Sequence, residues 1–82
     1  MSGPEKKYVY WSPDDWLIFP DTLNHAVVAR THHPREMPLS AGFVRQRPDC
    51  SIELYGESES LGLKADKEHE RIINAIFCRS AA

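Results

Sequence analysis

Two proline–aspartate pairs, Pro13-Asp14 and Pro48-Asp49, interrupt short apolar runs and constrain the fold of this sequence. Proline presets φ for the second position of a β-turn, and aspartate can hydrogen-bond its own local backbone. Apolar residues lie shortly before and after each pair. We therefore expect two β-hairpins, one around each turn.

The first hairpin joins the aromatic and β-branched run Tyr8–Trp11 to the run Trp16–Phe19. The same turn residues permit a second interpretation, in which Ser12 caps a helix and Asp15 closes a capping box. We prefer the turn, because the run before Pro20 is too short for a stable helix and proline disfavours a helical residue ahead of it.

The second hairpin lies within the stretch Ser40–Leu63, around which the chain is organised. After the turn, Ile52, Leu54 and Gly56 fall on one face of an extended chain and Glu53, Tyr55 and Glu57 on the other. This alternation is typical of a half-buried antiparallel strand. Residues 57–60 are a polar bend, and residues 61–63 are a short apolar return.

The segment 21–30 permits two predictions. Asn24 is an acceptable N-cap for a short helix with Leu23, Ala26 and Val27 on its inner side. The β-branched pair Val27-Val28 also fits a strand. We predict the helix, which fits the loop lengths better, and we predict a loop over residues 31–39, which contain two prolines and no periodicity.

The clearest helix is the last element, which Asp66 can cap and whose first turns carry Glu68 and Glu70 near the positive end of the dipole. Its predicted inner stripe has helical spacing and consists of His69, Ile72, Ile73, Ile76 and Phe77. Such a stripe is typical of a helix packed on a sheet.

These elements predict an α+β fold: an antiparallel sheet of four or five strands, one short helix and one C-terminal helix, in the order ββαβββα. The chain of 82 residues is expected to form one domain over residues 8–79. Residues 1–7 are expected to be a flexible tail, and residues 80–82 a frayed end.

Composition excludes some classes of protein. The net charge of −2 is not that of a dedicated nucleic-acid binder, although the segment Arg30–Arg47 is basic and the segment Glu53–Glu70 is acidic. The sequence has no apolar run long enough to cross a bilayer and no secretory signal pattern, so we expect a cytoplasmic protein without a membrane partner. Its two cysteines do not make a disulfide framework.

We expect no metal, no cofactor and no catalytic residue. The candidate ligands have no spacing typical of a metal site, and adjacent His32 and His33 do not easily reach one ion; these ligands are His25, His32, His33, His69, Cys50 and Cys78. Cys50 beside Arg47 is a conceivable nucleophile, but nothing in the sequence orients a base toward it.

Binding is the remaining class of function. Trp11 and Trp16 flank the first turn, and large aromatics and arginines are favoured in protein interfaces. We therefore predict a non-enzymatic interaction or regulatory protein, whose partner is another protein or a second copy in a homodimer. The candidate partner-binding residues are Trp11, Trp16, His25, Arg45, Arg47, Tyr55, Glu57, Ser58 and Ser60.

The alternative is a small nucleic-acid-binding domain that uses the segment Arg30–Arg47. In this alternative, Phe43 lies on one strand with Arg45 and Arg47, and Tyr55 lies across from it. Bases would stack on the two aromatic rings beside the basic patch. An enzyme of unknown type ranks third.

The segments Ser-Ala-Gly-Phe-Val (40–44) and Tyr-Gly-Glu-Ser-Glu-Ser-Leu-Gly-Leu (55–63), with Phe19-Pro20 ahead of His25-Ala26, resemble a group of small uncharacterised bacterial and phage-type proteins. The resemblance covers most of the chain and implies no specific activity. It implies at most that His25, Ser40, Gly42 and the bend Gly56–Gly62 are used together as a polar recognition spot. Turn and cap chemistry uses the same residue types.

Overall fold

Four antiparallel strands form the central sheet of the computed structural model, which describes residues 6–49 and 51–76 and the backbone of residues 77–81. The strands lie in the order β2-β1-β3-β4, and the two predicted hairpins are present as the neighbouring pairs β1–β2 and β3–β4. Their bounds are Lys6–Ser12 for β1, Asp15–Pro20 for β2, Ser40–Gln46 for β3 and Ile52–Tyr55 for β4.

The turns form as their sequences predict. Ser12 pairs with Asp15 across the first turn, and the register shifts at Trp11, which is the extra residue of a β-bulge. In the second turn, the Asp49 carboxylate accepts hydrogen bonds from the backbone N–H and the hydroxyl of Ser51 at 3.1 and 2.6 Å.

Strand β1 begins earlier than the predicted tail allows. Lys6 and Lys7 pair with β2 on one side and with β3 on the other, so the central position of β1 orders both residues. At the other end of the chain, the last helix continues through Ala81, within the segment expected to fray.

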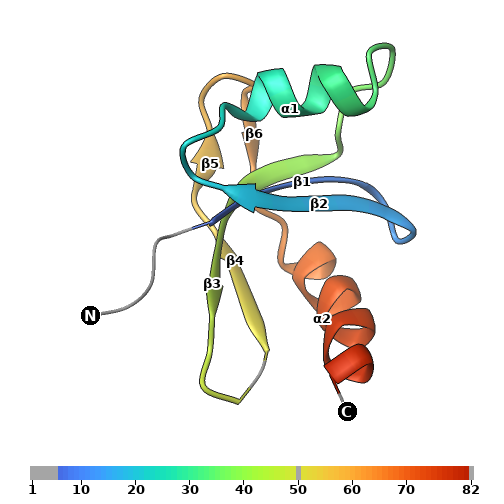
Figure 1. Cartoon of the computed structure of the whole chain (residues 1–82), viewed down its shortest axis with the longest axis vertical. Helices are drawn as coiled ribbons and strands as arrows, with labels where there is room; N and C mark the ends of the chain where they lie inside the picture. Colours follow the sequence, from blue (N-terminus) through green and yellow to red (C-terminus); the bar gives the residue numbers. More distant parts are fainter. Residues whose placement is uncertain (1–5, 50, 82) are drawn as a thin grey trace.

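Two helices cover opposite faces of the β1–β2 hairpin, α1 (His25–His32) and α2 (Lys67–Ala81) (Figure 1). The alternation of β1 explains why both faces are apolar: Tyr8 and Tyr10 point toward α2, while Val9 and Trp11 point toward α1. Neither of the described helices is long and apolar enough to cross a membrane.

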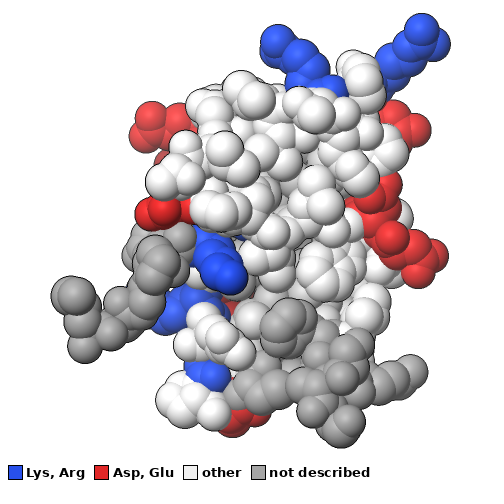
Figure 2. Space-filling model, viewed as in Figure 1, with Lys and Arg blue, Asp and Glu red and all other residues white. Residues whose placement is uncertain are grey.

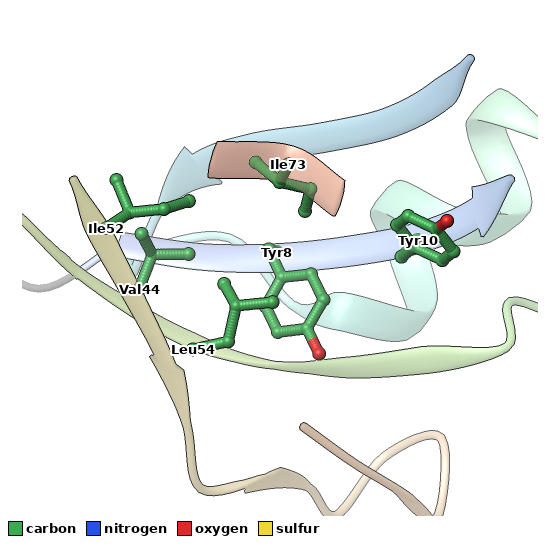
Figure 3. Packing of buried hydrophobic residues seen from close by; sticks show 6 residues of the cluster. All are labelled: Tyr8, Tyr10, Val44, Ile52, Leu54 and Ile73. Atoms are coloured by element: carbon green, nitrogen blue, oxygen red, sulfur yellow. The ribbon is translucent and has the colours of Figure 1, made fainter. Parts of the chain in front are cut away.

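The core under α2 is built from both hairpins and one helix residue (Figure 3). Ile73 of α2 is fully buried against the sheet, and burying a side chain of this size contributes about 1.5–3 kcal/mol. The buried members of this cluster are Tyr8, Tyr10, Val44, Ile52, Leu54 and Ile73.

The predicted inner stripe of α2 is wrong at Ile76, which is 40% exposed. The apolar side chains that the β3–β4 hairpin offers to α2 end at Val44 and Ile52, and most residues from Arg45 to Asp49 beyond them are polar. Ile76, three residues after Ile73, therefore lies at the margin of the core. Phe77 was predicted to share this stripe, but its side chain lies outside the described residues.

Helix α1 begins where the sequence predicts but faces the sheet with different residues. The Asn24 side chain accepts hydrogen bonds from the N–H groups of Ala26 and Val27, which confirms the cap. The predicted inner residues Leu23 and Val27 are 46% and 62% exposed. Instead His25 and Ala29, one turn apart, face the sheet, because the His25 ring hydrogen-bonds β3 and the small Ala29 permits close approach.

A second, two-stranded sheet consists of β5 (Glu57–Ser58) and β6 (Leu63–Lys64), and it lies on the α1 side of the molecule (Figure 1). Leu61 and Leu63 of this ribbon pack against the core cluster under α1. The fold is thus α+β with a four-stranded antiparallel sheet and two helices, as predicted. The predicted order ββαβββα is one strand short of the six observed.

Candidate functional site

Three side chains with metal-ligand chemistry converge where α1 ends above the β1–β2 turn. The Nε2 atom of His32 lies 2.8 Å from Oδ1 of Asp15, and the Nε2 atom of His33 contacts Oδ2 of the same carboxylate. The three ligand atoms all lie within 4.8 Å of one another. We refer to Asp15, His32 and His33 as the Asp–His–His cluster.

The chain builds this cluster from two local features. Along β2, Asp15, Leu17 and Phe19 alternate toward α1, which places the first of them beneath the helix end. The helix ends at His32 because Pro34 disfavours a helical conformation for His33, which becomes the C-cap with φ −135°.

Adjacent His32 and His33 thus converge on one carboxylate, an arrangement that their spacing in the sequence did not predict. Consecutive side chains of a helix point about 100° apart. Here the second histidine has left the helix, so its ring turns back toward the first and the two ring centroids lie 4.6 Å apart. Both Nε2 atoms then face one carboxylate.

Trp11 supports the cluster from below. Its indole ring lies 5.1 Å from the His32 ring and 4.8 Å from the His33 ring, measured between centroids. Its Nε1–H donates a hydrogen bond to the carbonyl of Glu36 at 3.2 Å, which holds the loop after α1 in place. The bulged residue of β1 thus orients both imidazoles.

The electrostatics suit a cation. Hydrogen bonds from His32 and His33 hold the pKa of Asp15 below its usual value of 3.8, so the carboxylate stays ionised at neutral and mildly acidic pH. The negative end of the α1 dipole also lies at this place.

The three side chains are of the types that bind zinc. Zinc binds imidazole nitrogen and carboxylate oxygen at about 2.0–2.2 Å, so the ligand atoms of a tetrahedral site lie about 3.3–3.6 Å apart. The side chains of Asp15, His32 and His33 are 31%, 37% and 30% exposed, which leaves room for the small rotations that reach this spacing. Three protein ligands leave one position open to another molecule.

A second polar chain, Tyr8–Ser40–His69, looks like catalytic machinery but is inaccessible. The Ser40 hydroxyl lies 2.9 Å from the Tyr8 hydroxyl and 2.6 Å from Nδ1 of His69, and Asp66 lies 4.0 Å from Nε2 of that ring. Ser40 is only 1% exposed, so no substrate reaches its oxygen. Burial also raises the pKa of Tyr8, which stays protonated and able to donate. This chain fastens α2 to the sheet.

His25 is held inside the protein on the other face. Its Nε2 lies 2.7 Å from the carbonyl oxygen of Gly42, and its ring meets the edges of Phe19 and Phe43. The Ser40 hydroxyl points to α2, whereas His25 lies on the α1 side, so the sheet separates two of the residues that the resemblance groups together.

The predicted partner-binding aromatics and arginines lie in several places. Trp11 is 7% exposed and belongs to the core, while Trp16 is half-buried on the α2 side. Arg45 lies 4.8 Å above the Tyr55 ring and 3.7 Å from the Glu53 carboxylate. Arg47 lies 3.6 Å from the Glu70 carboxylate and donates to the backbone of β4.

The predicted polar residues of the 56–62 bend belong to the β5–β6 ribbon. Ser58 is buried, and its hydroxyl accepts from the N–H of Leu61 and contacts the Ser60 hydroxyl, which is turn chemistry. Glu57 is exposed and pairs in register with Lys64. Cys50, which we considered as a nucleophile and did not favour, and the Cys78 side chain lie outside the described residues.

Sequence reasoning considered both His32 and His33 as ligands but missed Asp15 and their convergence. The signal that was available is Pro34, which ends the helix at His33. Comparison of the chain with protein-family models, with curated proteins and with solved structures gave no match.

Proposed function

We propose that this protein is a small non-enzymatic interaction or regulatory module that binds a divalent transition-metal ion through Asp15, His32 and His33. The observation that carries the proposal is the convergence of two imidazole nitrogens on one ionised carboxylate. Imidazole and carboxylate together are ligands that zinc and its neighbours in the first transition row accept.

The open coordination position gives such an ion a role in recognition. A structural zinc site has four protein ligands, whereas this cluster supplies three. A fourth ligand then comes from water, a small molecule or a partner. Metal loading would thus link the end of α1 to a second molecule, which fits a regulatory module.

The test is a zinc titration of metal-free protein in competition with a chromophoric chelator, followed by a Co²⁺ absorption spectrum. Asp15→Asn removes one charged ligand and keeps its size. The matched control is Asp14→Asn, the exposed neighbour in the same turn. We expect Asp15→Asn to weaken zinc binding by more than about tenfold. Loss of a residue that only hydrogen-bonds a metal ligand already weakens metal binding by about 10–100-fold, and Asp15 would be a ligand itself.

Two results would contradict the proposal. One is zinc affinity no better than that of the double variant His32→Gln/His33→Gln. The other is equal weakening by Asp14→Asn and Asp15→Asn, which would indicate a diffuse attraction to the acidic turn.

The alternative function, nucleic-acid binding, has less support. Arg45 and Arg47 each face a carboxylate of their own chain, which lowers the positive charge available to phosphates. On the face shown in Figure 2, basic side chains lie in separate groups rather than in one continuous surface. Binding that weakens steeply with salt and falls on Arg45→Ala would favour this alternative.

A further inference from the structure

A hollow of about 310 Å³ lies beside the Asp–His–His cluster. Helix α1, the loop that follows it and the turn between β5 and β6 form its walls. Of the three cluster residues, His33 alone lines it. The described lining comprises Ala26, Ala29, Arg30, His33, Pro34, Arg35, Glu36, Met37, Pro38, Ser60 and Leu61.

Two arginines of this hollow differ from the others that the structure describes. Arg45, Arg47 and Arg71 each have a carboxylate partner, whereas Arg30 and Arg35 have none among the described residues. In Figure 2, basic side chains project at the end of the molecule where α1 lies, and mostly uncharged surface, with acidic side chains at its margins, separates them from the other basic groups of this face.

The loop that carries Arg35 is fixed. The Trp11 indole binds the carbonyl of Glu36, and the N–H of Leu39 donates to the carbonyl of Tyr10 at 2.7 Å. Glu36 also belongs to the lining and offsets part of the positive charge, so two basic residues and one acidic residue line the hollow. The Ser60 hydroxyl adds a neutral donor on the opposite wall.

From these features we propose that the hollow binds a small oxyanion, of the size of a phosphate monoester or a dicarboxylate, between Arg30 and Arg35. A guanidinium presents parallel N–H donors that match the oxygens of phosphate and carboxylate. Two guanidiniums without an ion-pair partner at one concave site supply the charge for a dianion, and the described chain offers no carboxylate that neutralises both.

His33 connects this hollow to the metal site, and this part of the proposal rests on the function proposed above. His33 belongs to the Asp–His–His cluster and also lines the hollow, so a metal ion held by the cluster would add a dication beside the hollow. This charge favours an anion, and by linkage the anion strengthens metal binding by the same factor.

The first experiment maps anion binding on the metal-free protein by ¹H–¹⁵N NMR, with methyl phosphate and succinate as separate probes. We expect the amide signals that shift to be those of Arg30, Arg35, Ser60 and Leu61. The double variant Arg30→Gln/Arg35→Gln should lose most of the response. Arg71→Gln on α2, which removes an exposed arginine that pairs with Glu68, should keep it. The stronger of the two probes identifies the chemistry of the natural ligand.

Shifts that persist in Arg30→Gln/Arg35→Gln, or that spread over other basic residues, would overturn the oxyanion site. The second experiment repeats the titration with zinc-loaded protein, where we expect affinity for the probe to rise by about fivefold or more. Anion binding without zinc binding would refute the metal proposal and leave the oxyanion site standing. Zinc binding without arginine-dependent anion binding would refute the oxyanion site and leave the metal proposal standing.

Discussion

The His69 imidazole lies flat on the Tyr10 ring, with centroids 3.8 Å apart and an angle of 16° between the planes. Its Nδ1 atom lies 2.6 Å from the Ser40 hydroxyl, so one side chain of α2 is held at its face and at its edge. Strands β1 and β3 supply these two contacts. The helix is therefore positioned by polar chemistry as well as by the apolar contact of Ile73.

This arrangement predicts a cost for Ser40→Ala. The substitution leaves the buried Tyr8 hydroxyl and the His69 Nδ1 atom each without one partner. An unsatisfied buried polar group costs about 1–3 kcal/mol, so we expect a loss of this size in the free energy of unfolding measured in urea. Ser12→Ala is the control, because no described residue hydrogen-bonds the Ser12 hydroxyl. An equal loss in both variants would show that the network adds nothing.

His25 predicts how stability depends on pH. Burial holds the pKa of His25 below its usual value of 6.5, the Gly42 hydrogen bond opposes this shift, and the charge of Lys7 adds to it. The folded protein thus binds the proton more weakly than the unfolded chain, so this contribution is fully present above pH 6.5 and is lost as the pH falls.

The measurement is the urea midpoint at pH 8 and at pH 5.5 for the wild type and for His25→Gln. Glutamine keeps an N–H donor for Gly42 but does not titrate. The wild type should lose more stability on acidification than His25→Gln does. If the two proteins lose the same amount, His25 is not the group responsible.

The position of Trp11 predicts a local fluorescence signal from the metal. Its ring is 5.1 Å or less from both imidazoles of the Asp–His–His cluster, whereas Trp16 lies on the α2 side of the sheet. In Trp16→Phe, which leaves Trp11 as the fluorophore, Cu²⁺ or Co²⁺ should quench the emission with a saturable dependence. In Trp11→Phe the same ions should have little effect. Stronger quenching of Trp16 would place the ion elsewhere.

The packing around Gly42 leaves no room for a side chain. A Cβ atom there would lie 2.7 Å from the carbonyl oxygen of Tyr55 and 3.3 Å from the Cβ of Ala65. Gly42→Ala should therefore lower the free energy of unfolding by about 1–3 kcal/mol, as overpacking does. Gly62→Asn is the contrast, because Gly62 has φ +68° in open space and asparagine accepts that conformation. Equal stability of the two variants would contradict the predicted clash.

The elements that local sequence determines were predictable. The proline–aspartate turns formed, Asn24 capped α1, and Asp66 accepts from the N–H of Glu68 at the start of α2. Each of these features depends on residues within a few positions of one another. The helix face of α1 was not predictable in this way, because the contact of His25 with Gly42 joins residues far apart in sequence.

The candidate site was only partly predictable for the same reason. His32 and His33 were candidate ligands, but the spacing rules for helices and strands do not describe a pair that spans a helix end. The third member, Asp15, comes from a hairpin whose register depends on the bulge at Trp11. Pro34 marks the helix end in the sequence. The position of strand β2 beneath that end, which carries Asp15, depends on tertiary packing.

The way α2 binds β4 has a consequence for how copies of this protein can associate. Asn74 exchanges two hydrogen bonds with the backbone of Ile52, at 2.7 and 2.9 Å, and Glu70 accepts from the N–H of Leu54 at 2.8 Å. Side chains of the helix thus occupy backbone groups that an added strand would need. The sheet is closed at β4, and β2 is its other outer strand. A homodimer that extends the sheet would consequently pair β2 of one copy with β2 of the other. The two Asp–His–His clusters would then lie beside the dimer interface.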